Sequence, residues 1–281
     1  MATNATRAVR GVRGVRSRLA SAGLPTAVPI QRGLATAVTA VRASPLRLPT
    51  PHRRDYSSPS APTRPCPKCA APIPLPASPC PKCGALVPVP PGLSLHSLLD
   101  VSTPLPSSAG FDLVGELDRL PAHGYALDAR DLRNRMLRRQ RDLHPDKHGA
   151  AGGDVDLAAD LSGRVNKAYE TLASPLRRAE YILKVLGKGT QETDAVTDHD
   201  LLMEILEARE TLEEAEEASE VEEMRDSNHA KVVDLVQRLT ESFSRTPVDR
   251  DATKALAVEL KYWVGLEEAA KEKLGRLGEG R

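Results

Sequence analysis

Residues 128–147 have the sequence DARDLRNRMLRRQRDLHPDK, which combines a helical pattern with an abrupt end. Its apolar residues recur at the spacing of one helix face. They are Leu132, Met136 and Leu143. The other positions hold Arg130, Arg133, Arg135, Arg138, Arg139 and Arg141. Because Pro145 pushes the preceding residue out of the helical conformation, we expect a basic amphipathic helix over 128–143 that leads into an exposed His144-Pro145-Asp146 loop.

A second helix is predicted after this loop, over about 157–172. Val165, Ala168, Tyr169 and Leu172 give it an apolar face at helical spacing. The pattern resumes after Pro175. We expect the second helix to pack antiparallel to the basic helix.

Three further helical stretches follow, over roughly 198–225, 228–245 and 249–276. Asp198 and Asp249 are candidate N-caps of the first and last of these helices. The chain has no long β-rich stretch and no repeat of fixed period. We therefore expect an all-α fold.

The first of these three helices is acidic and has more apolar residues than one buried face requires. At about 100° per residue, one face carries Leu201, Ile205, Ala208 and Leu212. Leu202, Met203 and Leu206 fall on the other side, next to Glu210 and Glu214. Tyr262 lies off the apolar face of the last helix. These residues form a candidate partner surface, unless another segment of the same protein covers them.

Four cysteines lie in a proline-rich segment, residues 57–92, and form two CPKC pairs separated by ten residues. The pairs are Cys66 with Cys69 and Cys80 with Cys83. Each CxxC turn can present two thiolates, and two turns complete a tetrahedral site. This predicts one structural zinc ion per chain. Disulfides, or an iron–sulfur cluster on the same four thiolates, are alternatives.

Residues 1–56 have the composition of a mitochondrial transit peptide. The first 54 residues hold ten arginines, no lysine and no acidic residue. A disordered basic tail is the alternative. Residues 93–110 are rich in serine and proline and predict a linker. With no run of 18 apolar residues, a membrane-spanning transporter or receptor is excluded, and we expect a soluble protein.

The basic helix, the HPDK sequence and the returning NKAYETL helix together resemble a J-domain. This module activates the ATPase of DnaK-type chaperones. The resemblance implies that the His144-Pro145-Asp146 loop contacts the chaperone, and that the arginine face docks on an acidic surface of it. The candidate chaperone-binding arginines are Arg133, Arg138 and Arg141. The protein itself would then not be an enzyme.

The order of motifs further resembles the HscB-type (Jac-type) J-protein co-chaperones of iron–sulfur cluster biogenesis. LLMEILEARETLEEAEE at 201–217 and ELKYWVGLEEAAKEK at 259–273 carry this resemblance. It implies an L-shaped protein with a J-domain at 111–190 and a three-helix bundle at 191–281. In the mitochondrial matrix, the bundle would bind the iron–sulfur scaffold protein and deliver it to the chaperone. The implied scaffold contacts are Leu202, Met203, Leu206, Glu207, Glu210, Glu214 and Tyr262.

Two features depart from that family. The first J-domain segment is represented only by FDLVGELDRLP at 111–121, and Arg139 replaces an apolar residue of the basic helix. Helix packing in this J-domain is therefore expected to be looser or shifted in register.

A zinc-ribbon RNA-binding or translation-associated protein is the alternative function, in which the arginine helix contacts phosphates. No aromatic stacking platform accompanies the arginines, and the chain balances 39 basic against 38 acidic side chains. We therefore expect neither a nucleic acid nor a membrane as a partner. An enzymatic function has no support, because no nucleophile, paired carboxylates or glycine-rich phosphate loop stands outside the predicted helices.

Overall fold

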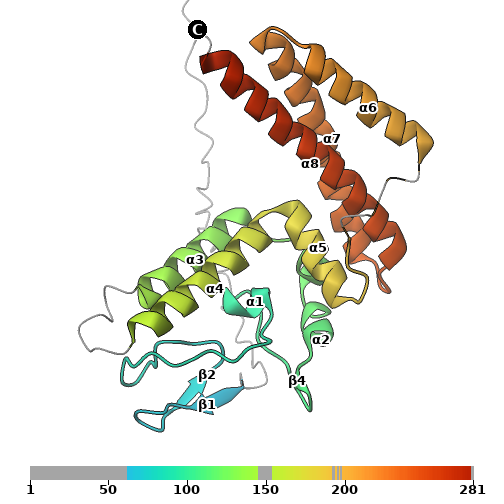
Figure 1. The fold of residues 1–281 in the computed structure, drawn as a ribbon. Helices are drawn as coiled ribbons and strands as arrows, with labels where there is room; N and C mark the ends of the chain where they lie inside the picture. The colour runs from blue at the N-terminus through green and yellow to red at the C-terminus, as the bar shows by residue number, and fades with distance from the viewer. Residues whose placement is uncertain (1–61, 145–153, 192–193, 195, 197, 280–281) are drawn as a thin grey trace, which may run out of the picture. The chain divides into compact units, whose positions relative to one another are not determined.

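The computed structural model describes residues 62–144, 154–191, 194, 196 and 198–279. The predicted presequence and the Pro145 and Asp146 positions lie outside this range. The described part is predominantly helical, which confirms the predicted fold class (Figure 1). None of its helices has the length and hydropathy needed to cross a bilayer.

The cysteine segment begins with a small antiparallel sheet of β1 (Thr63–Pro65) and β2 (Pro72–Pro74). Its own core comprises Cys66, Ile73, Cys80 and Val87. Leu86, next to Val87 in the chain, is instead buried in a second cluster together with Leu132 and Leu143. The segment therefore has a small core of its own and also contributes to the core of the helices that follow.

Residues 93–110 differ from the predicted linker. They contain α1 (Leu95–Leu98), β3 (Pro106–Ser107) and the start of β4 (Gly110–Phe111). Leu98 and Leu99 are buried in the same cluster as Leu132. The serines of this segment are not free polar residues of a flexible connection. Ser94, Ser97 and Ser102 all donate hydroxyl hydrogen bonds to the buried carboxylate of Glu116 in α2 (Leu113–Leu117).

The predicted hairpin is formed by α3 (Ala129–Leu143) and α4 (Val155–Ala173) (Figure 1). Asp128 caps α3 by accepting the backbone N–H of Asp131 at 2.6 Å. Gln140 joins the two helices, because its Nε2 donates to the carbonyl of Ser162 at 3.0 Å and its Oε1 accepts the Ser162 hydroxyl at 2.7 Å. After Ser174, the chain continues directly into α5 (Pro175–Val185).

The three C-terminal helices are α6 (His199–Glu214), α7 (Ala218–Ser244) and α8 (Arg250–Glu279). Asp198 and Asp249 cap α6 and α8, as predicted. The break between α6 and α7 falls near Ala215, about ten residues before the predicted one. A reciprocal cap between Glu217 and Glu220 starts α7 there. Lys273 of α8 donates to the carbonyls of Leu212 and Glu213 and so stabilises the end of α6.

The bundle and α5 share one core. Ile182 and Leu183 of α5 are fully buried in a cluster that includes Leu239 of α7 and Trp263 of α8. The 3₁₀ turn η1 (Pro121–Gly124) joins the same region, since Nδ1 of His123 lies 2.7 Å from the carbonyl oxygen of Phe243. The turn η1, α5 and the bundle therefore form one packed region.

Candidate functional site

The exposed side of α3 carries the three arginines that the sequence singles out, Arg133, Arg138 and Arg141. On a helix of about 100° per residue they span roughly 140°, on the side away from Leu132 and Leu143. The latter two leucines are 2% and 0% exposed, so the predicted buried face is confirmed. The arrangement leaves a positively charged surface that can meet an acidic partner.

Arg135 and Arg139 are directed elsewhere. Arg135 pairs with Asp131 at 2.7 Å and also donates to the carbonyl of Asp100. Arg139 is only 7% exposed and donates to backbone carbonyls of the cysteine segment. Arg139 is therefore a buried residue whose two Nη groups are hydrogen bonded, while its Nε has no hydrogen-bond partner.

His144 is the C-cap residue of α3 and is exposed. Its φ of −61° and ψ of 127° are extended, as expected for a residue that precedes proline. The chain therefore leaves the helix at the first residue of the His144-Pro145-Asp146 loop.

Leu137 is a surface residue that the helical pattern of Leu132, Met136 and Leu143 does not single out. It is 47% exposed and lies on the arginine side of α3, between the directions of Arg133 and Arg141. An exposed leucine among arginines adds apolar contact area to a charged surface, as in the centre of many interfaces. The signal in the sequence was its position off the Leu132–Leu143 face.

The α6 helix presents the predicted acidic and apolar face. Met203 is 52% exposed and Leu206 is 44% exposed, while Leu202 is half-buried. Glu207, Glu210 and Glu214 are exposed on the same side of the helix. The opposite side buries Ile205 and Leu212. Within the described residues no segment covers Met203 or Leu206, so the alternative of an internal cover does not hold there.

Tyr262 differs from the α6 residues. It lies on α8, is half-buried and packs against the core cluster of the bundle. Its position off the Trp263 stripe therefore does not make it a fully exposed side chain.

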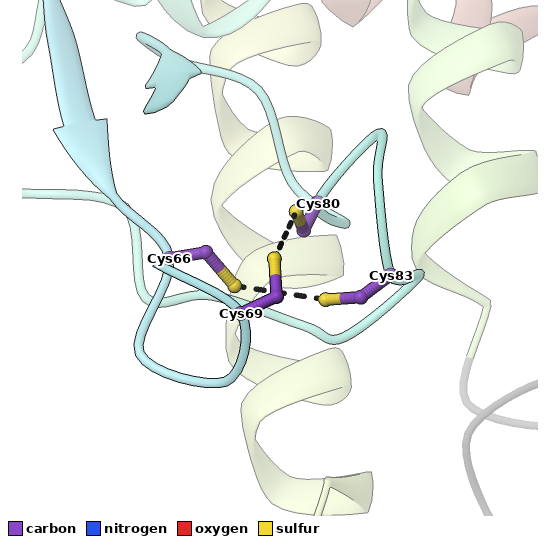
Figure 2. Close-up of side chains that lie close together, drawn as sticks. All are labelled: Cys66, Cys69, Cys80 and Cys83. Carbon is purple, nitrogen blue, oxygen red and sulfur yellow. Dashed lines mark hydrogen bonds between the residues drawn. The ribbon is translucent and has the colours of Figure 1, made fainter. Parts of the chain in front are cut away.

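The four cysteine side chains converge from two loops, and their sulfur atoms all lie within 4.8 Å of one another (Figure 2). Sγ of Cys66 is 3.6 Å from Sγ of Cys83, and Sγ of Cys69 is 3.8 Å from Sγ of Cys80. Zinc–thiolate bonds of about 2.3 Å place the sulfurs of a tetrahedron about 3.8 Å apart. The four residues therefore fit a single tetrahedral metal ion.

The two cysteine loops repeat one backbone pattern. Cys66 donates its N–H to Ala71 at 2.8 Å and accepts that of Ala70 at 2.9 Å. Cys80 makes the same two bonds, to Ala85 at 2.8 Å and from Gly84 at 2.9 Å. The loops therefore hold the sulfurs in place through main-chain bonds.

The thiols differ in acidity. Burial opposes ionisation of Cys66, but N–H groups of the loop and neighbouring thiols outweigh it and lower its pKa to about 6. At Cys83, the N–H of Ala85 favours the thiolate, but burial and the three other cysteines outweigh it and raise its pKa to about 11. A first thiolate forms readily and a fourth does not, because like charges gather in one place. A bound cation removes that penalty.

The alternatives for the cysteines have different geometries. All four cysteines are free rather than joined in disulfides. A cluster of two or four irons distributes its thiolates over several metal atoms and needs a wider arrangement than one ion. Sulfurs within 4.8 Å of one another match a mononuclear site better.

Comparison with known proteins gives a consistent picture. Residues 197–271 match the family model of the HSCB C-terminal oligomerisation domain. The chain is 33% identical over 149 residues to the iron–sulfur cluster co-chaperone protein HscB homolog of Arabidopsis thaliana, covering 53% of this chain and 59% of that protein. It is 28% identical over 156 residues to the mitochondrial J-type co-chaperone JAC1 of Saccharomyces cerevisiae, covering 53% of this chain and 79% of that protein.

The crystal structure of human co-chaperone protein HscB superimposes with a TM-score of 0.59 and 28% identity. This match covers 75% of the present chain and 98% of the human chain. The sequence matches, the C-terminal domain and the fold agree with one another, and they confirm the resemblance inferred from the motifs. Residues 197–271 therefore match the HSCB C-terminal domain, and the chain resembles the HscB/Jac-type co-chaperones in both sequence and fold.

Proposed function

We propose that this protein is an iron–sulfur co-chaperone that binds a scaffold protein, delivers it to a mitochondrial DnaK-type chaperone and stimulates the ATPase of that chaperone. One observation carries the proposal. The domain that matches the HSCB C-terminal model, residues 197–271, contains the α6 face with Met203 and Leu206 exposed to solvent. Exposed apolar side chains rimmed by carboxylates are typical of a docking surface.

The chaperone site is proposed at the end of α3. Arg133, Arg138 and Arg141 steer an acidic partner and orient it, while the His144-Pro145-Asp146 loop makes the contact that activates ATP hydrolysis. Charge steering mainly affects the association rate and weakens as salt screens it. Stimulation by this protein should therefore fall at high ionic strength.

The scaffold site is proposed on α6. Leu202, Met203 and Leu206 supply the apolar contacts, and Glu207, Glu210 and Glu214 supply the acidic rim. Tyr262 adds an aromatic contact from α8 through the part of its side chain that remains accessible. Binding energy in such interfaces concentrates in a few apolar and aromatic groups, so the apolar residues should matter most.

The cysteine site is proposed to hold one zinc ion through Cys66, Cys69, Cys80 and Cys83. A site with four thiolates is closed, so the ion would order the loops and leave no position for a substrate. Its role would then be structural.

A mitochondrial location is proposed from the names of the yeast relatives, including the mitochondrial JAC1, and from the composition of residues 1–56. Import into the matrix and removal of residues 1–56 extend this proposal. The relatives named above are co-chaperones, which favours this proposal over the RNA-binding alternative.

The test is the steady-state ATPase rate of a mitochondrial DnaK-type chaperone with and without this protein, in the presence of the scaffold protein. The wild type should raise the rate, and His144→Gln should abolish the increase without changing helical content by circular dichroism. His144 is exposed, so the substitution should leave the fold intact. Equal stimulation by the variant would contradict the proposed J-domain role.

A further inference from the structure

Arg139 connects the basic helix to the cysteine segment. Its Nη2 donates to the carbonyl of Pro76 at 3.1 Å, and its Nη1 donates to the carbonyl of Ser78 at 3.4 Å. Both carbonyls lie between the two cysteine loops, after Cys69 and before Cys80. Arg139 thus contacts the part of the chain whose shape depends on the two loops being held together.

A second arginine completes this connection. Nη2 of Arg64 donates to the carbonyl of Ala77 at 2.9 Å, so three consecutive carbonyls, of residues 76–78, accept hydrogen bonds from two guanidinium groups. The hydroxyl of Ser78 also accepts the N–H of Val87 at 3.1 Å. This segment is therefore ordered by side chains and main-chain groups that all belong to the cysteine segment or to α3.

The charges favour this arrangement when a metal ion is bound. Arg64 and Arg139 donate to neighbouring carbonyls of residues 76–78, so their two positive charges lie close together. Four thiolates around a divalent cation carry a net charge of about −2, whereas the metal-free cluster keeps some of its thiols protonated and is less negative. Metal loading therefore adds negative charge in the segment that these two guanidinium groups contact.

Arg139 contacts the cysteine segment from a position close to the C-terminal end of α3. Arg139 lies one turn before Leu143, at the end of the helix, where carbonyl groups lack helical partners and the chain frays most easily. Leu143 is fully buried among residues that include Leu86 of the cysteine segment. The last turn of α3, which carries Arg141 and leads into His144, thus shares a buried cluster with the cysteine segment.

We propose that Arg139 is a positioning residue, through which metal binding by the four cysteines orders the last turn of α3 and so sets how well the arginine face docks on the chaperone. The part that concerns the chaperone rests on the proposed function. The part that concerns the order of α3 does not.

The first test is amide hydrogen exchange in the full chain, with zinc bound and after removal of the metal by a chelator. Metal removal should speed exchange of the amides of residues 139–143 at least about fivefold in the wild type. In Arg139→Leu these amides should exchange fast even with metal bound, and chelation should add little. Leucine keeps the apolar stem and removes only the link to Pro76 and Ser78.

Arg164→Leu is the matched control. Arg164 lies on α4 and donates to the carbonyls of Val89 and Pro90 at 2.7 and 3.0 Å, so it makes the same kind of contact with the cysteine segment away from α3. This variant should keep the metal dependence of exchange at residues 139–143. Arg139→Lys, which retains the charge, covers the case in which the leucine variant does not fold, and should exchange at an intermediate rate.

Two outcomes would overturn the proposal. One is unchanged exchange in α3 of the wild type when the metal is removed. The other is full metal dependence in Arg139→Leu, which would mean that the coupling bypasses this residue, since independent effects add and linked ones do not.

The second test measures the ATPase of the chaperone as a function of co-chaperone concentration. Removing the metal, or substituting Arg139 by leucine, should raise the concentration for half-maximal stimulation about fivefold, with a smaller effect on the maximum rate. If the metal-loaded wild type gives no stimulation at all, the proposed function fails, while the exchange experiment still decides whether Arg139 couples the metal site to α3. A third result is possible, in which amide exchange of α3 depends on the metal but the concentration for half-maximal stimulation does not change. It would refute only the claim that the order of α3 sets docking on the chaperone.

Discussion

Ala70 and Gly84 occupy the same place in the two cysteine loops. Each is four residues after the first cysteine of its pair, and each donates its N–H at 2.9 Å to the carbonyl of that cysteine. Both have a positive φ, 56° for Ala70 and 71° for Gly84. The left-handed conformation suits glycine and costs an L-residue with a Cβ roughly 1–2 kcal/mol. One loop therefore has the residue that its backbone favours, and the other is strained.

We predict that Gly84→Ala destabilises the metal-bound cysteine segment by about 1 kcal/mol, because no other atom lies within 4 Å of the added Cβ and only the backbone is strained. This corresponds to roughly fivefold weaker zinc binding. Ala70→Gly should act in the opposite direction, with a smaller gain because glycine loses more chain entropy on folding. Competition with a chromophoric chelator measures the zinc affinity of both variants. Stronger zinc binding by the Gly84 variant would contradict the argument.

Arg178 should be far more important for stability than its neighbour Arg177. Arg178 is 8% exposed, and its guanidinium donates to the carbonyls of Leu172 at 2.7 Å and Tyr125 at 2.5 Å. Arg178→Ala should lower the free energy of unfolding by about 2–4 kcal/mol, because two buried carbonyls lose a charged donor. Arg177→Ala, at an exposed position of the same helix, should change it by less than about 0.5 kcal/mol. Urea denaturation of both variants measures the two changes in free energy of unfolding. Equal changes would contradict the prediction.

Truncation of the exposed apolar residues of α6 should weaken partner binding more than it lowers the stability of the fold. Truncation of Leu202, Met203 and Leu206 to alanine should weaken scaffold binding by several kcal/mol if they anchor the partner. Met203 and Leu206 are largely exposed, so most of that loss should not appear in the thermal melt. Ile205→Ala is the control, since Ile205 is 3% exposed and should lose about 2–4 kcal/mol of stability. Calorimetric titration with the scaffold protein decides, and unchanged affinity with a lower melting temperature would mean that these side chains are ordinary core.

His96 should make the fold sensitive to mild acid. Burial, opposed by the carbonyl of Gly124 and assisted by Arg178, lowers the pKa of His96 from 6.5 to about 4. The imidazole of His96 is therefore protonated below about pH 6.5 in the unfolded chain but only below about pH 4 in the folded chain. The contribution of this pKa shift to the free energy of unfolding is complete above pH 6.5. It is lost as the pH falls from 6.5 to 4, by about 3 kcal/mol in total.

The measurement is the free energy of unfolding of wild type and His96→Gln at pH 7, 6 and 5. The difference in free energy of unfolding between wild type and His96→Gln should shrink as the pH falls, because the wild type loses stability there and glutamine does not titrate. A constant difference would show that His96 is protonated equally in the folded and unfolded chains.

Helical periodicity predicted the helices and their buried faces well, because the spacing of Leu132, Leu143, Ile205 and Leu212 is a local property of the chain. The start of α7 was missed, although Glu217 and Glu220 have the spacing of a reciprocal cap, because the acidic run looked continuous. Serine and proline between 93 and 110 predicted a linker for a similar reason. Composition does not reveal that Ser94 and Ser97 face a buried Glu116 about twenty residues later in the chain.

Arg139 shows what the sequence leaves undetermined at the candidate site. Its partners, Pro76 and Ser78, are 63 and 61 residues away, and no local pattern marks a proline-rich loop as an acceptor for a guanidinium. The four cysteines were the opposite case, since their spacing alone predicted that they converge. The convergence is confirmed by sulfurs within 4.8 Å of one another, while the identity of the ion stays a prediction.

Leu86, Val89, Leu93, Leu98 and Leu99 all lie before residue 100 and all belong to the buried cluster that contains Leu132 and Leu143. A chain cut between them and α3 would expose both halves of that cluster. We therefore expect an independently folding piece that includes the hairpin to begin before Leu86 and not at residue 111. Calorimetry should consequently find the cysteine segment and the hairpin melting in one transition, because neither has a complete apolar interior of its own.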